Sequence, residues 1–255
     1  MRRCPCIIAF AALLIFAGGA SADSMTFTDP GSNVWAGVYV NPYTGKDNTN
    51  GKVLTLYCDD WNTEFSGNPT WNAVITPLGS SAAANLRFGN ATSASVYDFT
   101  LNSDDIQATN YTPLDFPGPY CLYLEAAYLF GQIQTLSSEN QTTARRIAEQ
   151  EFSAAAWSLF VEGSSVGTLV NAINNSGSTF AVDVAHDLTA AASAAGTPAH
   201  PNYQVASGWY VVTPASGFVM QEFMYGPFPV PEPASILLLG VVLLGCGRGL
   251  ARRWS

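Results

Sequence analysis

The hydrophobic repeat of this chain changes period twice, and that change limits the fold more than any other feature. Between residues 34 and 75, β-branched and aromatic residues form short runs bounded by turn residues, which is typical of strands. Between residues 119 and 162, apolar residues recur three and four positions apart, which is typical of helices. Strand-like runs return from residue 203. Strands, then helices, then strands indicate one α+β domain whose terminal strands pair.

The strand-like segments predict a β-sandwich-like body. Strands are expected at residues 34–40, 53–58 and 71–75, and again at 203–213 and 218–225. Asn41-Pro42 and Thr44-Gly45 are turn signals after the first of these strands, and the polar segment 47–51 is expected to be a hairpin tip. The segment 79–118 is predicted to be a long connection.

The middle of the chain predicts a helical insertion. One helical face is formed by Leu122, Ala126, Leu129, Phe130 and Ile133, and a second by Ala148, Phe152, Ala155, Ala156 and Leu159. The short join between these two helices predicts an αα-hairpin. Two further helices are expected at 166–174 and 182–195.

The N-terminal end has the pattern of a secretory signal peptide. Arg2 and Arg3 precede an apolar run at residues 7–17, and Ala20-Ser21-Ala22 forms a small-residue cleavage site. Residues 1–22 are therefore predicted to be removed, so that the mature chain begins at Asp23. The exported domain is predicted to span residues 23–229.

The C-terminal end, residues 230–255, has a second targeting pattern. Pro231-Glu232-Pro233 precedes an apolar run at residues 234–247, which predicts a single membrane helix followed by Arg248, Arg252 and Arg253. Fourteen helical residues span roughly 21 Å, less than the ~30 Å hydrocarbon core, so insertion requires local thinning or snorkelling arginines. The arginines would hold this end in the cytoplasm, with the domain on the other side.

This arrangement resembles the PEP-CTERM sorting signal of Gram-negative bacteria. The resemblance implies recognition by an exosortase, a membrane enzyme similar to Cys proteases, and export linked to exopolysaccharide or biofilm matrix. The partners it implies are signal peptidase, an exosortase and, as a candidate, exopolysaccharide. The chain would be anchored in the membrane by its tail and then transferred to the cell surface or extracellular matrix. An ordinary tail anchor that is never processed is the alternative.

The charge of the body argues against nucleic acid as a partner. Residues 23–229 contain five basic and eighteen acidic residues, a net charge of −13, whereas the whole chain carries −9. Binding to phosphates requires lysine and arginine. This charge suits a domain that stays soluble or binds cations outside the cell.

Two cysteines remain once the targeting ends are set aside. Cys4 and Cys6 lie in the signal peptide and Cys246 in the tail, which leaves Cys58 and Cys121 in the body. In an oxidising compartment this pair predicts one disulfide, worth about 4 kcal/mol in the chain-entropy model. No cysteine or histidine spacing indicates a metal centre, and no cofactor is expected.

Three segments of the body carry a second resemblance. Residues 57–62 with Trp71, residues 123–130 and residues 154–160 resemble a group of PEP-CTERM proteins that are similar to thioester domains of Gram-positive adhesins. That resemblance implies a covalent adhesin with an internal thioester between Cys58 and a glutamine. Ungapped alignment places Ser153 at the glutamine position, and Gln150 lies nearly one helical turn earlier.

An acidic group near Cys58 is the other candidate site. Asp59, Asp60 and Glu64 could bind Ca²⁺ through oxygen ligands, or act as an acid and base on a glycan. Structural carboxylates beside a strand end are the simpler interpretation. No G-x-S-x-G motif occurs. The sequence therefore predicts a structural or adhesive exported protein without enzymatic activity, with a secreted glycan hydrolase or a thioester adhesin as alternatives.

Overall fold

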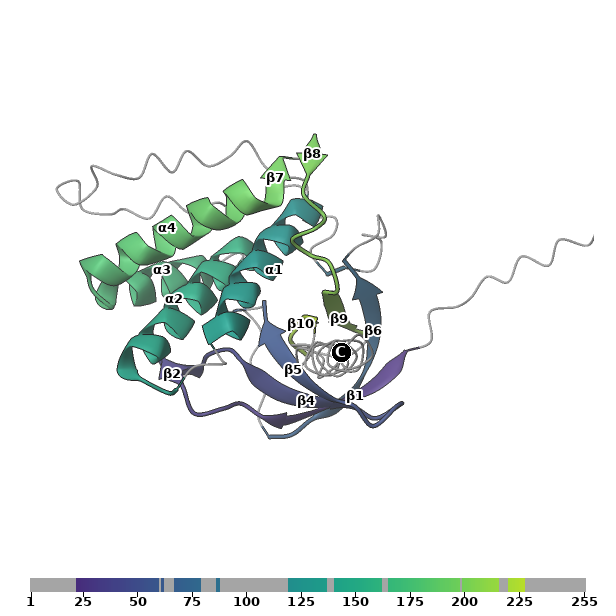
Figure 1. Cartoon of the computed structure of the whole chain (residues 1–255). Coiled ribbons are helices and arrows are strands. Elements are labelled where there is room, and N and C mark those ends of the chain that lie inside the picture. Colours follow the sequence, from purple (N-terminus) through teal and green to yellow (C-terminus); the bar gives the residue numbers. More distant parts are fainter. Residues whose placement is uncertain are drawn as a thin grey trace, which may run out of the picture.

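The computed structural model describes residues 22–59, 61, 67–78, 86–87, 119–136, 140–161, 165–197, 199–215 and 220–227. Figure 1 shows its elements. The strands are β1 (Asp23–Asp29), β2 (Val34–Trp35), β3 (Val38–Tyr39), β4 (Tyr43–Asp47), β5 (Val53–Cys58), β6 (Thr70–Pro77), β7 (Gly196–Thr197), β8 (His200–Pro201), β9 (Tyr210–Pro214) and β10 (Phe223–Tyr225). The helices are α1 (Pro119–Leu136), α2 (Thr143–Phe160), α3 (Ser165–Asn175) and α4 (Ser178–Ala195).

The main sheet is a closed barrel, so the predicted β-sandwich is wrong, although the α+β class holds. Its strand order is β1-β4-β5-β10-β9-β6, and every pairing is antiparallel. Strand β1 closes it, because Met25 lies opposite Asp47 of β4 on one side and opposite Trp71 of β6 on the other. A strand at 23–29 was not predicted, and without it the sheet would have two open edges.

Local backbone requirements explain two other differences from the prediction. The expected strand at 34–40 is split into β2 and β3, because Ala36 (φ 50°) and Gly37 (φ 85°) form a two-residue hairpin turn. The turn signal at Gly45 is wrong, since Gly45 lies inside β4. A Cβ on Gly45 would lie 2.4 Å from Cδ1 of Leu56, so glycine lets that side chain fill the barrel.

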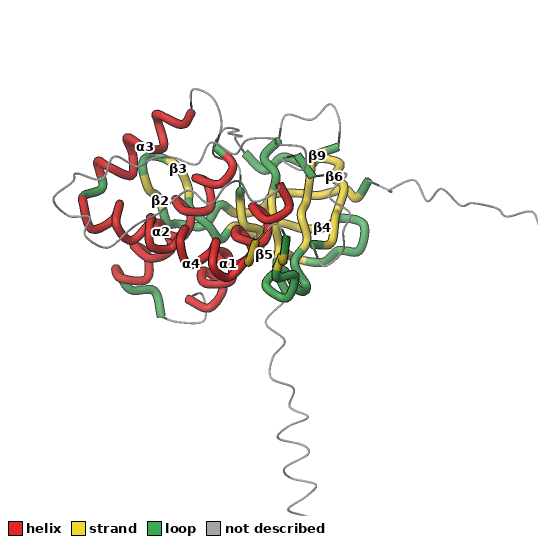
Figure 2. The backbone as a smooth tube through the Cα atoms, turned by 90° about the horizontal axis from the view of Figure 1, so that it is seen from above, coloured by secondary structure: helices red, strands yellow, loops and turns green. Residues whose placement is uncertain are grey.

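The predicted αα-hairpin is confirmed by α1 and α2. Helix α3 extends one residue beyond the expected range at each end, whereas α4 begins at Ser178, four residues before the expected start at residue 182. Helix α2 begins where the Thr142 hydroxyl accepts a hydrogen bond from the Arg145 N–H. Helices α1, α2 and α4 pack on one another. Figure 2 shows the helices gathered on one side of the molecule and the barrel on the other.

The pleat of β5 divides the apolar residues into two cores. Leu54, Leu56 and Cys58 pack inside the barrel, whereas Tyr57 packs against the helices. The neighbouring strand β10 alternates in the same way, with Phe223 inside and Met224 outside. Because successive side chains of a strand point to opposite faces, the barrel wall serves both cores at once.

Neither targeting end is among the described residues, apart from Ala22. The signal peptide, the Pro231-Glu232-Pro233 motif, the apolar run and the arginine cluster all lie outside them. Of the helices that the structure describes, none has the length and apolar character needed to cross a membrane.

Candidate functional site

The end of β5 brings the sequence-predicted site residues to the junction of barrel and helices. Cys58 is the last residue of β5 and Asp59 follows it, and both side chains are buried. Helices α1 and α2 lie against the outside of the barrel here, as Figure 1 shows. The pleat therefore directs the Cys58 thiol into the barrel and Asp59 toward the helices.

The backbone of Cys58 is held by two buried side chains. The Asn41 side chain accepts a hydrogen bond from the Cys58 N–H (2.6 Å) and donates one to the Cys58 carbonyl (3.3 Å). Trp157 Nε1 of α2 donates to the same carbonyl at 3.0 Å. Asn41 Nδ2 also lies 3.3 Å from Ser153 Oγ, so Ser153 occupies the helix position that faces the end of β5.

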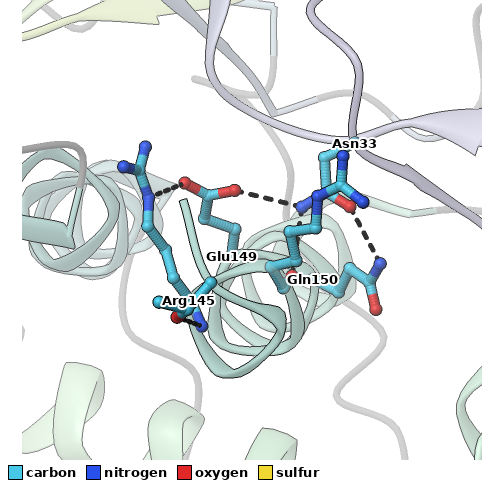
Figure 3. A network of polar contacts seen from close by, with 6 residues as sticks. Asn33, Arg145, Glu149 and Gln150 are labelled. Atoms are coloured by element: carbon cyan, nitrogen blue, oxygen red, sulfur yellow. Dashed lines mark hydrogen bonds and ion pairs between the residues drawn. The ribbon is translucent and has the colours of Figure 1, made fainter. Parts of the chain in front are cut away.

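Gln150, the glutamine that precedes Ser153 by three positions, is engaged elsewhere. Gln150 Nε2 donates to Asn33 Oδ1 at 2.9 Å and to the Val34 carbonyl at 3.3 Å. Asn33 in turn donates to Glu149 Oε2, and Glu149 Oε1 accepts from Arg145 Nε at 2.8 Å. Figure 3 shows these side chains joined in one network that ties the segment before β2 to α2. With Gln150 held there and Cys58 facing the barrel core, the described geometry gives a thioester no support.

The predicted disulfide between Cys58 and Cys121 is not formed in the structure, which has both residues as buried thiols. The physical reason is the pleat of β5. Cys58 packs beside Phe223 inside the barrel, whereas Cys121 belongs to the first turn of α1, outside the barrel wall.

We expect the processed protein to contain two thiols after unfolding, because the barrel wall separates Cys58 from Cys121. Thiol titration in denaturant and the intact mass measure this directly. A mass lower by two hydrogens would contradict the structure in favour of the disulfide. A mass lower by one ammonia, with methylamine labelling of Cys58, would instead indicate a thioester.

Asp59 belongs to a buried pair of carboxyl groups. Its side chain interacts with that of Glu222, and both residues are 0% exposed. In the barrel, Cys58 lies opposite Phe223, and Phe223 lies opposite Val212. One residue further along, Asp59, Glu222 and Thr213 therefore form a row on the helix-facing side of the wall.

Three donors converge on Glu222. The Tyr123 hydroxyl of α1 donates to Oε1 at 2.5 Å, and the Thr213 hydroxyl of β9 donates to Oε2 at 2.5 Å. The Arg87 backbone N–H donates to Oε2 at 3.1 Å. Glu222 thus connects two barrel strands, the first turns of α1 and the segment at Arg87.

Burial raises the pKa of Glu222, although its hydrogen bonds with Thr213, Tyr123, Arg87 and Asp59 act in the opposite direction. Two interacting carboxyl groups in a buried site disfavour the state in which both are charged. The arrangement has no exposed carboxylate that could reach a substrate.

The described residues do not support the calcium hypothesis. Asp60 and Glu64 lie outside them, and Asp59 is committed to Glu222. Within the described ranges no three acidic, histidine or cysteine side chains are placed to hold a metal ion. Asp47 lies at the opposite end of the β4–β5 hairpin, where it accepts hydrogen bonds from Thr49 N–H and Asn50 Nδ2.

Sequence analysis missed the residues that complete this junction: Asn41, Tyr123, Thr213 and Glu222. Glu222 gave one usable signal, because an acid in the middle of the predicted strand 218–225 must be either exposed or paired. Nothing in the sequence indicated that its partner is Asp59, since strand order decides that contact.

Comparison with known proteins bears on the C-terminal end. The sequence model of the PEP-CTERM protein-sorting motif matches residues 229–253, which confirms the resemblance drawn from Pro231-Glu232-Pro233. No curated protein and no solved structure matches the chain significantly. The motif supports exosortase-dependent sorting of an exported protein.

Proposed function

We propose that this chain, which carries a PEP-CTERM sorting motif, is a bacterial surface or matrix protein sorted by an exosortase. The observation that carries the proposal is the position of the motif, which begins at residue 229 directly after a domain described to Pro227. The net charge of −13 on residues 23–229 supports a domain that stays dispersed outside the cell.

The domain has a structural or adhesive role linked to exopolysaccharide or biofilm, without enzymatic activity. The main support is the junction, where the interacting carboxyl groups of Asp59 and Glu222 are fully buried. Signal peptidase removes residues 1–22, and the tail then anchors the domain in the membrane. The exosortase transfers it from there to the cell surface or matrix.

Replacing Pro231, Glu232 and Pro233 with alanine tests the sorting step. We expect the precursor to keep its tail and to stay in the membrane fraction, because the recognised segment is lost. The measurement is the precursor-to-product ratio, with cell fractionation, in cells that contain an exosortase.

The matched control changes Gln204 and Ser207 to alanine, two exposed positions in the turn before β9. This control should be processed like the unchanged chain. Normal processing and release of the triple-alanine variant would overturn the proposed function.

A further inference from the structure

The last strand of the domain is an inner strand of the barrel. Strand β10 lies between β5 and β9, with Phe223 opposite both Cys58 and Val212. The chain leaves β10 at Tyr225, and the sorting motif begins four positions later at residue 229. Three residues, Gly226, Pro227 and Phe228, therefore join the barrel to the sorting signal, and the structure describes the first two.

Gly226 is fixed under an aromatic ring. A Cβ at this position would lie 2.7 Å from Cζ2 and 2.8 Å from Cε2 and Cη2 of Trp209, so only glycine allows this approach. Trp209 is itself buried against Tyr57 and Phe130, with ring centroids 5.5 and 6.3 Å away. The ring that covers Gly226 is therefore held by both the barrel and α1.

The residues on either side of Gly226 are held as well. Tyr225 stacks on Tyr210 of β9, with ring centroids 4.8 Å apart and planes 12° apart. The Pro227 carbonyl accepts a hydrogen bond from Gln134 Nε2 of α1 at 2.7 Å. Pro227 also packs on Gly208, where an added Cβ would lie 3.1 Å from the Pro227 Cβ.

We propose that these contacts position the sorting signal for the exosortase. The exit clamp, defined as Gln134, Gly208, Trp209 and Tyr210 around residues 225–227, fixes where and in which direction the signal leaves the domain. This inference rests on the proposed function and adds a role for the folded domain. The exosortase then receives the signal from a fixed point on the domain.

The sequence beyond the clamp is consistent with such a role. Proline stands at every second position, at Pro227, Pro229, Pro231 and Pro233. Each proline ring fixes its own φ and restricts the preceding residue to extended conformations. A clamped base limits the positions that the motif can take relative to the domain.

Inserting ten Gly/Ser residues between Pro227 and Phe228 tests the inference in the full-length chain. The insertion keeps the clamp and the motif but removes the fixed geometry between them. We expect the precursor-to-product rate in a pulse-chase experiment to fall at least about fivefold, because the flexible linker frees the motif from the clamped chain end. The same insertion between the exposed Gly67 and Asn68 is the control, and should leave the rate unchanged.

Gln134→Ala weakens the clamp without changing the linker length. Losing one hydrogen bond should lower the processing rate by roughly two- to fivefold, while the melting temperature falls by only about 2–4 °C. Gln132→Ala, two positions earlier on the same helix, is the matched control.

An unchanged or faster rate for the 227/228 insertion would overturn the inference, because the enzyme would then read only the linear motif. If alanine at residues 231–233 also had no effect, the proposed function would fail as well. If only the alanine replacement blocked processing, the proposed function would stand without the clamp.

Discussion

Glu222→Leu is expected to lower the free energy of unfolding by about 3–5 kcal/mol. The change removes the acceptor of the Tyr123 hydroxyl, the Thr213 hydroxyl and the Arg87 N–H, which lie around a fully buried carboxyl group. Each buried donor left unsatisfied costs about 1–3 kcal/mol, and the similar size of leucine limits the cavity term. Urea denaturation of the purified protein, followed by tryptophan fluorescence, measures the loss.

Asp59→Asn is the matched control for Glu222→Leu. The asparagine has the size of Asp59, and its amide can donate a hydrogen bond to Glu222 without needing a proton on either carboxyl group. We expect a change within about 1 kcal/mol, as for other substitutions that keep a buried hydrogen bond. Equal losses for the two variants would show that Glu222 is not the centre of the junction.

The second large effect is a dependence of stability on pH that runs opposite to ordinary acid denaturation. Burial raises the pKa of Glu125 on α1 to about 8, well above its usual value near 4.5. Burial also raises the pKa of Glu222. Burial, with the charges of Asp183 and Asp187, raises the pKa of Glu151 to about 7. The pKa of Asp187 is raised to about 6, chiefly by burial.

The sign follows from which form the fold prefers. A carboxyl group whose pKa is higher in the folded state binds its proton more tightly there than in the unfolded chain. Its contribution is fully present below the unfolded pKa and is lost as the pH rises through the folded pKa. For Glu125 the window is roughly pH 4.5 to 8, and the loss by pH 8 is about 4 kcal/mol. Glu151 and Asp187 are partly exposed, so solvent screening makes their contributions smaller.

We therefore expect the protein to be more stable at pH 5 than at pH 8. Urea unfolding at intervals between these values measures the slope. Glu125→Gln should remove most of the slope above pH 6, because the amide has no proton to lose. Glu151→Gln, at a partly exposed position, should remove much less. Stability that rises from pH 5 to pH 8 would contradict the assignment.

Local patterns made part of this structure predictable. The spacing of apolar residues placed α1 and α2 because a helix buries one continuous stripe along its own sequence. Strand β5 was predicted with its observed bounds, since its apolar and β-branched run is uninterrupted between Lys52 and Asp59. The sorting motif was recognised for the same reason, because proline, apolar and arginine residues define it within 25 positions.

The other features depend on which strands pair, and local sequence patterns do not give that pairing. Gly45 indicated a turn in the sequence but lies in strand β4. Glycine is needed there because Leu56 of the neighbouring strand occupies the space that a Cβ would take. The cysteine pair suggested a disulfide, yet the alternation of β5 directs Cys58 into the barrel while α1 carries Cys121 outside it.

The sequence by itself determined the α+β class, the helical insertion, the acidic character of the body and the sorting motif at its C-terminal end. Each of these depends on composition or on a pattern of residues close together in the chain. Only the tertiary structure decided that β1 closes a barrel and that Asp59 meets Glu222. It alone fixed Gly226 under Trp209, just before the sorting motif. These contacts join segments far apart in the chain, and strand order and pleat, rather than local preference, bring them together.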